Sequence, residues 1–157
     1  MGESVKFHFK LQPLLNKERI YEEECVVRLR AVQGALQNEK QGLENLKKRK
    51  LTSQSELSTR KRQEITSGEL TTFEDYFVGL AVNMNTCKTR IQEISTKMHT
   101  VQEELIEIVK KRKALEKLRD RWEEEHRDYL EHLSNKEMDD IGMIKFNNKM
   151  VVENAKD

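Results

Sequence analysis

Four histidines and two cysteines are the side chains of this sequence best suited to binding a metal or acting as nucleophiles. The sequence has neither the C-x-x-C nor the H-E-x-x-H spacing that metal sites and metalloproteases use. His126 and His132 are six residues apart, so a helix would not place them on one face. We therefore interpret the histidines as solvated helix residues and predict no metal site. The four are His8, His99, His126 and His132.

Nucleotide chemistry and acid–base chemistry have no recognisable motif either. No G-x-x-x-x-G-K-[ST] or G-x-G-x-x-G segment is present to hold phosphates. The adjacent carboxylates of Asp139 and Asp140 would point in different directions on a helix, with no pocket to raise the pKa of one of them. The sequence thus predicts a non-enzymatic protein without catalytic residues or a cofactor.

The composition indicates which elements must position the remaining side chains. Of the 157 residues, 36% are charged and 36% are hydrophobic, with one Pro, six Gly and 6% aromatic residues. Ordinary domains have about 25% charged and ~45–50% apolar residues. This composition excludes a compact α/β enzyme or a β-sandwich and leaves long helices or disorder. The net charge of +1 disfavours nucleic acid as a partner.

Apolar residues recur with the heptad spacing of a coiled coil. We call the positions that alternate every four and three residues the seam. From Cys87 to Leu133, eleven of the fourteen seam positions are apolar, and from Leu11 to Glu64 nine of sixteen are. A repeat of this length predicts two long coiled-coil helices rather than disorder.

Residues typical of a helix end and of a helix start lie between the two repeats and predict a turn. Gly68 resembles the residue that follows a helix C-terminus, and Thr71 and Glu74 have the spacing of a capping box. A short link makes long helices antiparallel neighbours, so the predicted fold is all-α, a long antiparallel two-helix coiled-coil hairpin. The expected boundaries are a hairpin over 1–142, with arm one at about 10–66, a turn at about 67–71 and arm two at about 72–141, and a flexible tail over 143–157.

The hairpin also predicts where the cysteines and the basic runs lie. Folding about residue 69 places Cys25 near residue 113 and Cys87 near residue 51, too far apart for a disulfide. Lys110–Lys113 would lie opposite Glu22–Glu24. The runs Lys47–Lys50 and Arg60–Arg62 face no acidic run in this register, so they are either solvated or bound by an acidic partner.

An aromatic and apolar cluster follows the expected turn and has two interpretations. It could be a wider packing layer that closes the tip, or an exposed patch for a partner. The cluster consists of Phe73, Tyr76, Phe77, Leu80, Ala81 and Met84.

Membrane and export signals are missing from the sequence. No run approaches the ~18 apolar residues that a membrane helix needs, and the segment Met1–Phe7 lacks the apolar region of a signal peptide. We expect a cytosolic protein that reaches membranes only through a partner.

Both ends of the chain resemble the flagellar export protein FliJ family. The segment Phe7–Leu15 has two alternating aromatics followed by Leu-Gln-Pro-Leu-Leu, and Lys136–Ile141 reads Lys-Glu-Met-Asp-Asp-Ile. The resemblance implies a non-enzymatic stalk and adaptor of the type III export apparatus at the base of the flagellum. It implies three partners: the hexameric export ATPase, the cytosolic domain of the membrane export gate, and export chaperones.

The resemblance also implies binding residues and a location. Contact with the export gate would use Tyr76, Leu80, Asn83 and Cys87. The ends of the helices would bind the ATPase through Leu11, Leu14, Leu15, Met138 and Ile141. We expect a monomer at the cytoplasmic side of the inner membrane. The alternative is a homodimeric coiled-coil scaffold without an ATPase partner, which would have twice the mass in solution.

Overall fold

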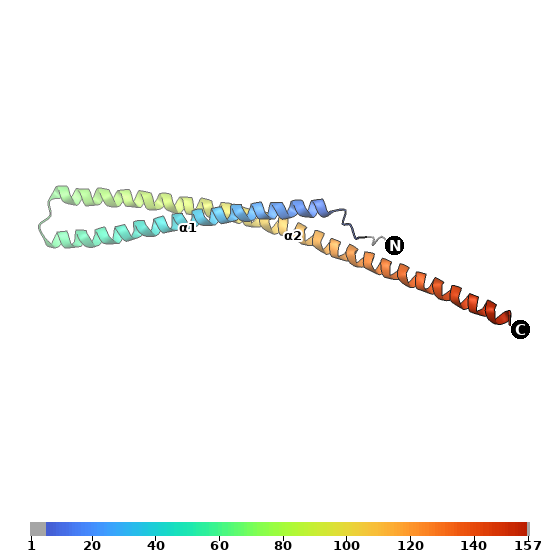
Figure 1. Cartoon of the computed structure of the whole chain (residues 1–157). Helices are drawn as coiled ribbons and strands as arrows, with labels where there is room; N and C mark the ends of the chain where they lie inside the picture. The colour runs from blue at the N-terminus through green and yellow to red at the C-terminus, as the bar shows by residue number, and fades with distance from the viewer. Residues whose placement is uncertain (1–5, 157) are drawn as a thin grey trace. The chain divides into compact units, whose positions relative to one another are not determined.

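The computed structural model describes residues 6–156 and contains two α-helices, α1 (Gln12–Arg62) and α2 (Ser67–Asn154). No strand occurs among the described residues. The helices run antiparallel and pack against each other along much of α1 (Figure 1). The predicted all-α two-helix hairpin is therefore confirmed. Residues 1–5 of the expected hairpin and Asp157 of the expected tail lie outside the described residues.

The start of α1 follows from Pro13. A proline in the first helical turn removes an N–H that would have no partner there, and its fixed φ suits a helix. The backbone N–H of Gln12 donates to the carbonyl of Phe9 at 3.0 Å, and that of Leu15 donates to the carbonyl of Leu11 at 3.0 Å. The backbone therefore turns before the helix begins.

The link between the helices lies at residues 63–66, so the predicted turn at 67–71 is wrong. Thr66 caps α2, since its hydroxyl accepts a hydrogen bond from the N–H of Glu69 at 3.2 Å. Gly68 is helical, with no positive φ. Thr71 is an interior residue whose hydroxyl donates to the carbonyl of Ser67 at 2.9 Å. The sequence offers two Thr-x-x-Glu patterns, and the first one starts the helix.

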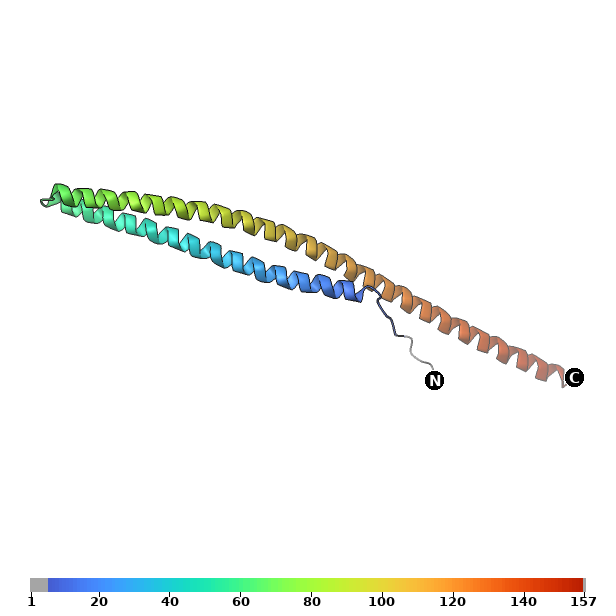
Figure 2. The same cartoon turned by 90° about the horizontal axis from the view of Figure 1, so that it is seen from above.

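The chain divides into two units, each containing a stretch of both helices. One unit is Ile20–Val109, and the other combines Met1–Arg19 with Lys110–Asp157. In the first unit the two helical stretches lie side by side in both views (Figure 2). Its buried apolar side chains are Cys25, Val32, Leu36, Leu80 and Val101.

The seam predicted for α2 matches the burial along the helix. Every seam position from Cys87 to His126 is buried or half-buried. The same spacing continues toward the start of α2 through Leu70, Phe73, Phe77, Leu80 and Met84, which are likewise not exposed. The packing-layer interpretation therefore holds for most of the apolar cluster, while Tyr76 and Ala81 are exposed.

The register differs from the predicted one because the link is earlier in the chain. Cys25 lies against Val101 and not near residue 113. The Cys25 thiol donates a hydrogen bond to the Val101 carbonyl at 3.6 Å. Across the same unit, Arg28 pairs with Glu104 at 2.8 Å and Arg90 with Glu39 at 3.8 Å. Both cysteines are free, as the hairpin predicted.

In the second unit, two aromatic contacts join the N-terminal segment to α2. The Phe9 and Trp122 rings meet edge to face with centroids 5.4 Å apart, and Phe7 lies 5.8 Å from the His126 ring. Every described residue after His126 is exposed. The prediction that residues 127–142 belong to the paired hairpin is therefore wrong, because no described segment covers them.

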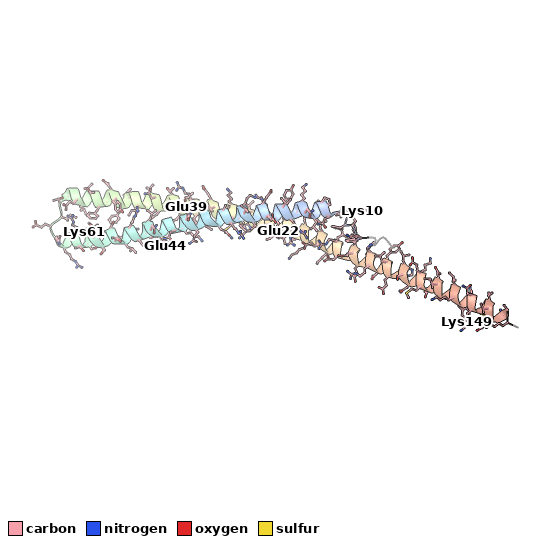
Figure 3. All side chains as sticks on the ribbon, in the orientation of Figure 1. Lys10, Glu22, Glu39, Glu44, Lys61 and Lys149 are labelled. Atoms are coloured by element: carbon pink, nitrogen blue, oxygen red, sulfur yellow. The ribbon has the colours of Figure 1, made fainter. Side chains whose placement is uncertain are left out.

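The predicted tail over 143–157 also differs from the structure. Residues 143–154 continue α2 as a helix. Figure 3 shows Lys149 on this part of α2 and Lys10 near the start of α1. Residues 143–154 contain neither Pro nor Gly, so the helical backbone hydrogen bonds can continue through them.

Candidate protein-binding surfaces

The residues predicted to contact the export gate have four different environments. Tyr76 is 43% exposed and Leu80 only 4% exposed. Asn83 is exposed and Cys87 is half-buried. Leu80 and Cys87 lie in the seam between the helices, so a partner could touch Tyr76 and Asn83 but not Leu80 in the folded hairpin. The four residues therefore do not form one exposed face of the hairpin, and their contact with the export gate stays a prediction.

Tyr76 lies at a shallow groove between the two helices of its unit. We call it the Tyr76 groove; it has a volume of about 360 Å³ and is lined by Lys48, Arg49, Thr52, Ser53 and Tyr76. An adjoining hollow of about 370 Å³ shares Ser53 and Tyr76 and adds Glu56, Thr72 and Phe73. The Tyr76 ring also contacts the Phe77 ring, with centroids 6.1 Å apart. A half-exposed aromatic ring thus separates a cationic groove from a hollow with one carboxylate.

The α1 side of this groove was not among the predicted site residues. Lys48 and Arg49 belong to the basic run for which the sequence left two interpretations open. The cluster of basic residues is visible in the sequence. Whether it forms a groove depends on which residues of α1 lie beside Tyr76. The predicted register placed the link too late in the chain to bring these residues together.

The residues predicted to bind the ATPase all belong to the second unit. Leu15 is fully buried at 0% exposure and Leu11 is half-buried, whereas Leu14 is 43% exposed. Met138 and Ile141 are 68% and 53% exposed. Leu11 and Leu15 therefore support the packing of the unit, and the other three have apolar side chains open to a partner.

Further apolar side chains are exposed beside Met138 and Ile141. Met143 is 65%, Ile144 59% and Phe146 62% exposed. Met138, Ile141 and Ile144 recur every three residues and so lie along one side of the helix, where exposed apolar side chains can form a binding surface. This part of α2 therefore offers a second candidate surface.

Glu116 takes part in two ion pairs of the second unit, one with Arg19 of α1 that joins the helices and one with Arg112 within α2. Its carboxylate accepts hydrogen bonds from Arg112 at 2.9 Å and from Arg19 at 3.4 Å. Burial raises the pKa of Glu116, but these hydrogen bonds and charges outweigh burial and lower the pKa overall. In the other unit, the hydrogen bond from Arg28 to Glu104 raises the pKa of Arg28.

Residues 6–156, which the structure describes, contain neither a metal-binding cluster nor a membrane-spanning helix. Within them, no cluster of three or more His, Cys, Asp or Glu side chains has a geometry that could hold a metal ion. No helix in residues 6–156 combines the length and apolar character needed to span a bilayer.

The fold and surfaces define a helical hairpin with exposed apolar and cationic side chains of the kind that bind other proteins. The family described as Flagellar FliJ protein matches residues 7–151. The chain belongs to this family, which makes it a component of the flagellar export apparatus. No curated protein matches the chain significantly, and neither does any solved structure.

Proposed function

We propose that this protein is a non-enzymatic stalk and adaptor of the flagellar type III export apparatus. In this role it binds the hexameric export ATPase and promotes its assembly. It couples the ATPase to the cytosolic domain of the export gate and escorts export chaperones. The observation that carries the proposal is a two-helix hairpin of this family with exposed apolar side chains in both of its units.

The ATPase contact is proposed for the exposed members of the predicted set. Leu14, Met138 and Ile141 would enter the interface, while Leu11 and Leu15 keep the helices packed behind Leu14. Apolar anchors that are already exposed on a helix can bind a partner groove without any rearrangement of the hairpin. Binding there leaves the seam between α1 and α2 intact.

The gate contact is proposed for the surface around Tyr76 and Asn83. Leu80 and Cys87 would act indirectly, because seam packing at these positions fixes the side of α2 on which Tyr76 lies. Tyrosine is common at the centre of protein interfaces because it combines apolar area with a hydroxyl that can hydrogen bond. The protein would then act on the cytoplasmic side of the inner membrane at the flagellar base.

A pull-down tests this function directly. The tagged full chain is mixed with the purified cognate ATPase and, separately, with the cytosolic domain of the export gate. We expect the wild-type chain to retain both partners. Leu14→Ala should weaken retention of the ATPase only, and Tyr76→Ala should weaken retention of the gate domain only. Retention of neither partner by the wild-type chain would contradict the proposal.

A further inference from the structure

The basic run Lys47–Lys50 has no role in the packing described so far. Arg60–Arg62 form the last turn of α1, where cations stabilise the negative end of the helix dipole. Lys47–Lys50 lie more than two turns earlier, and all four are exposed. Lys47 pairs with Glu44 on its own helix at 3.3 Å. Lys48 and Arg49 instead line the Tyr76 groove.

The groove combines two kinds of recognition within one surface. Lys48 and Arg49 supply hydrogen-bond donors with positive charge, and a guanidinium can bind a carboxylate through two parallel hydrogen bonds. Across the groove, the ring of Tyr76 offers apolar area on the other helix. A partner that fits both needs a carboxylate next to an apolar side chain.

We propose that the Tyr76 groove binds an acidic segment of the export gate's cytosolic domain, with its carboxylate on Lys48 and Arg49 and an apolar side chain against Tyr76. This inference rests on the gate contact proposed above and adds the chemistry of the partner. Both helices then contribute to the contact, so the folded hairpin is required. The acidic segment also complements the surplus of positive charge at residues 47–50.

Nucleic acid fits this groove less well than an acidic protein segment. The chain has a net charge of only +1, which gives no broad positive field to hold a phosphate backbone. The adjoining hollow is lined by Glu56, which would repel the neighbouring phosphates. An acidic protein segment can avoid that repulsion by placing a carboxylate on Lys48 and Arg49 and an uncharged residue beside Glu56, whereas every nucleotide of a nucleic acid carries a phosphate.

The test compares two charge-reversal variants of the full chain in binding to the purified gate domain. The variant K48E/R49E changes the groove, and K47E/K50E makes the same change of net charge in the same run, outside the groove. We expect K48E/R49E to weaken binding at least about tenfold and K47E/K50E less than about threefold. Wild-type binding should also weaken with rising salt, and K48E/R49E should lose most of this dependence.

The remaining outcomes separate this inference from the proposed function. If Tyr76→Ala weakens gate binding but K48E/R49E does no more than K47E/K50E, the carboxylate contact is wrong while the gate contact at this surface stands. If the wild-type chain does not bind the gate domain, both are wrong. If K48E/R49E leaves gate binding unchanged and abolishes retention of a single-stranded oligonucleotide, the groove binds phosphate and the inference is overturned.

Discussion

Leu80 and Tyr76 lie one helical turn apart on α2 but differ in their surroundings. Leu80 is buried in the seam at 4% exposure, and Tyr76 is 43% exposed beside the groove. A buried leucine stabilises the folded state because its apolar area is removed from water and because it packs closely against its neighbours. At the residue scale, we therefore expect Leu80 to contribute to the stability of the hairpin and Tyr76 to contribute to the proposed recognition of the gate.

Replacing Leu80 with alanine tests its seam role. We expect Leu80→Ala to lower the free energy of unfolding by about 2–3 kcal/mol, because the helices cannot fully collapse around the lost side chain. The matched control is Val82→Ala, at a position 59% exposed, with an expected change below about 0.5 kcal/mol. Urea unfolding followed by circular dichroism measures both, and equal effects would contradict the seam position of Leu80.

The ion pairs of Glu116 give a prediction with a definite pH dependence. A carboxyl whose pKa is lower in the folded state stabilises the fold above its unfolded pKa of about 4.3. That stabilisation is lost as the pH falls through the lowered folded pKa. Because Glu116 is partly exposed, Glu116→Gln should cost less than ~1 kcal/mol at pH 7.

The same variant should unfold like the wild type once the carboxyl is protonated. Urea unfolding at pH 7 and at pH values below 4.3 measures how the difference between the two proteins changes. A difference that stays constant over this pH range would show that the Glu116 carboxylate does not carry the effect.

At the scale of elements, the start of α2 depends on Thr66. Its hydroxyl accepts from the N–H of Glu69, and the Glu69 carboxylate contacts Arg60 of α1 at 3.4 Å. Thr66→Ala should therefore lower the free energy of unfolding by about 1 kcal/mol. Thr71→Ala should have little effect, since alanine suits a helix interior. Urea unfolding measures the free energy of unfolding of both variants. A larger loss for Thr71→Ala than for Thr66→Ala would support the predicted helix start near residue 72.

The helices themselves were predictable because their burial follows a fixed period. The 4-3 spacing identified the buried side of α2 from Cys87 to His126 without any knowledge of the partner helix. It failed at Tyr129 and Leu133, which are 59% and 37% exposed. Their spacing is correct, but a heptad pattern does not reveal where the facing helix ends.

The candidate site was less predictable because it combines two distant segments. A turn centred on residue 69 would place Tyr76 beside residue 62, whereas the structure places it at the groove with Ser53. The choice between two Thr-x-x-Glu patterns thus changed the neighbours of Tyr76 by more than two helical turns. Local sequence cannot make that choice, since both patterns satisfy the same capping rule.

At the scale of the whole molecule, balanced charge and separate binding surfaces suit an adaptor. Positive and negative side chains pair across the helices at Arg19 with Glu116, Arg28 with Glu104 and Arg90 with Glu39. These three pairs join the two helices, while the chain as a whole has a net charge of +1. Each unit also has exposed apolar side chains, for which we propose contacts with the partner proteins.

The rate of ATP hydrolysis by the cognate export ATPase tests the central claim most directly. The rate and the hexamer population are measured while the purified full chain is titrated in. We predict that both rise and reach a plateau, and that Met138→Asp together with Ile141→Asp reduces the rise without loss of helicity. No change in either quantity at saturating wild-type protein would contradict the proposed role.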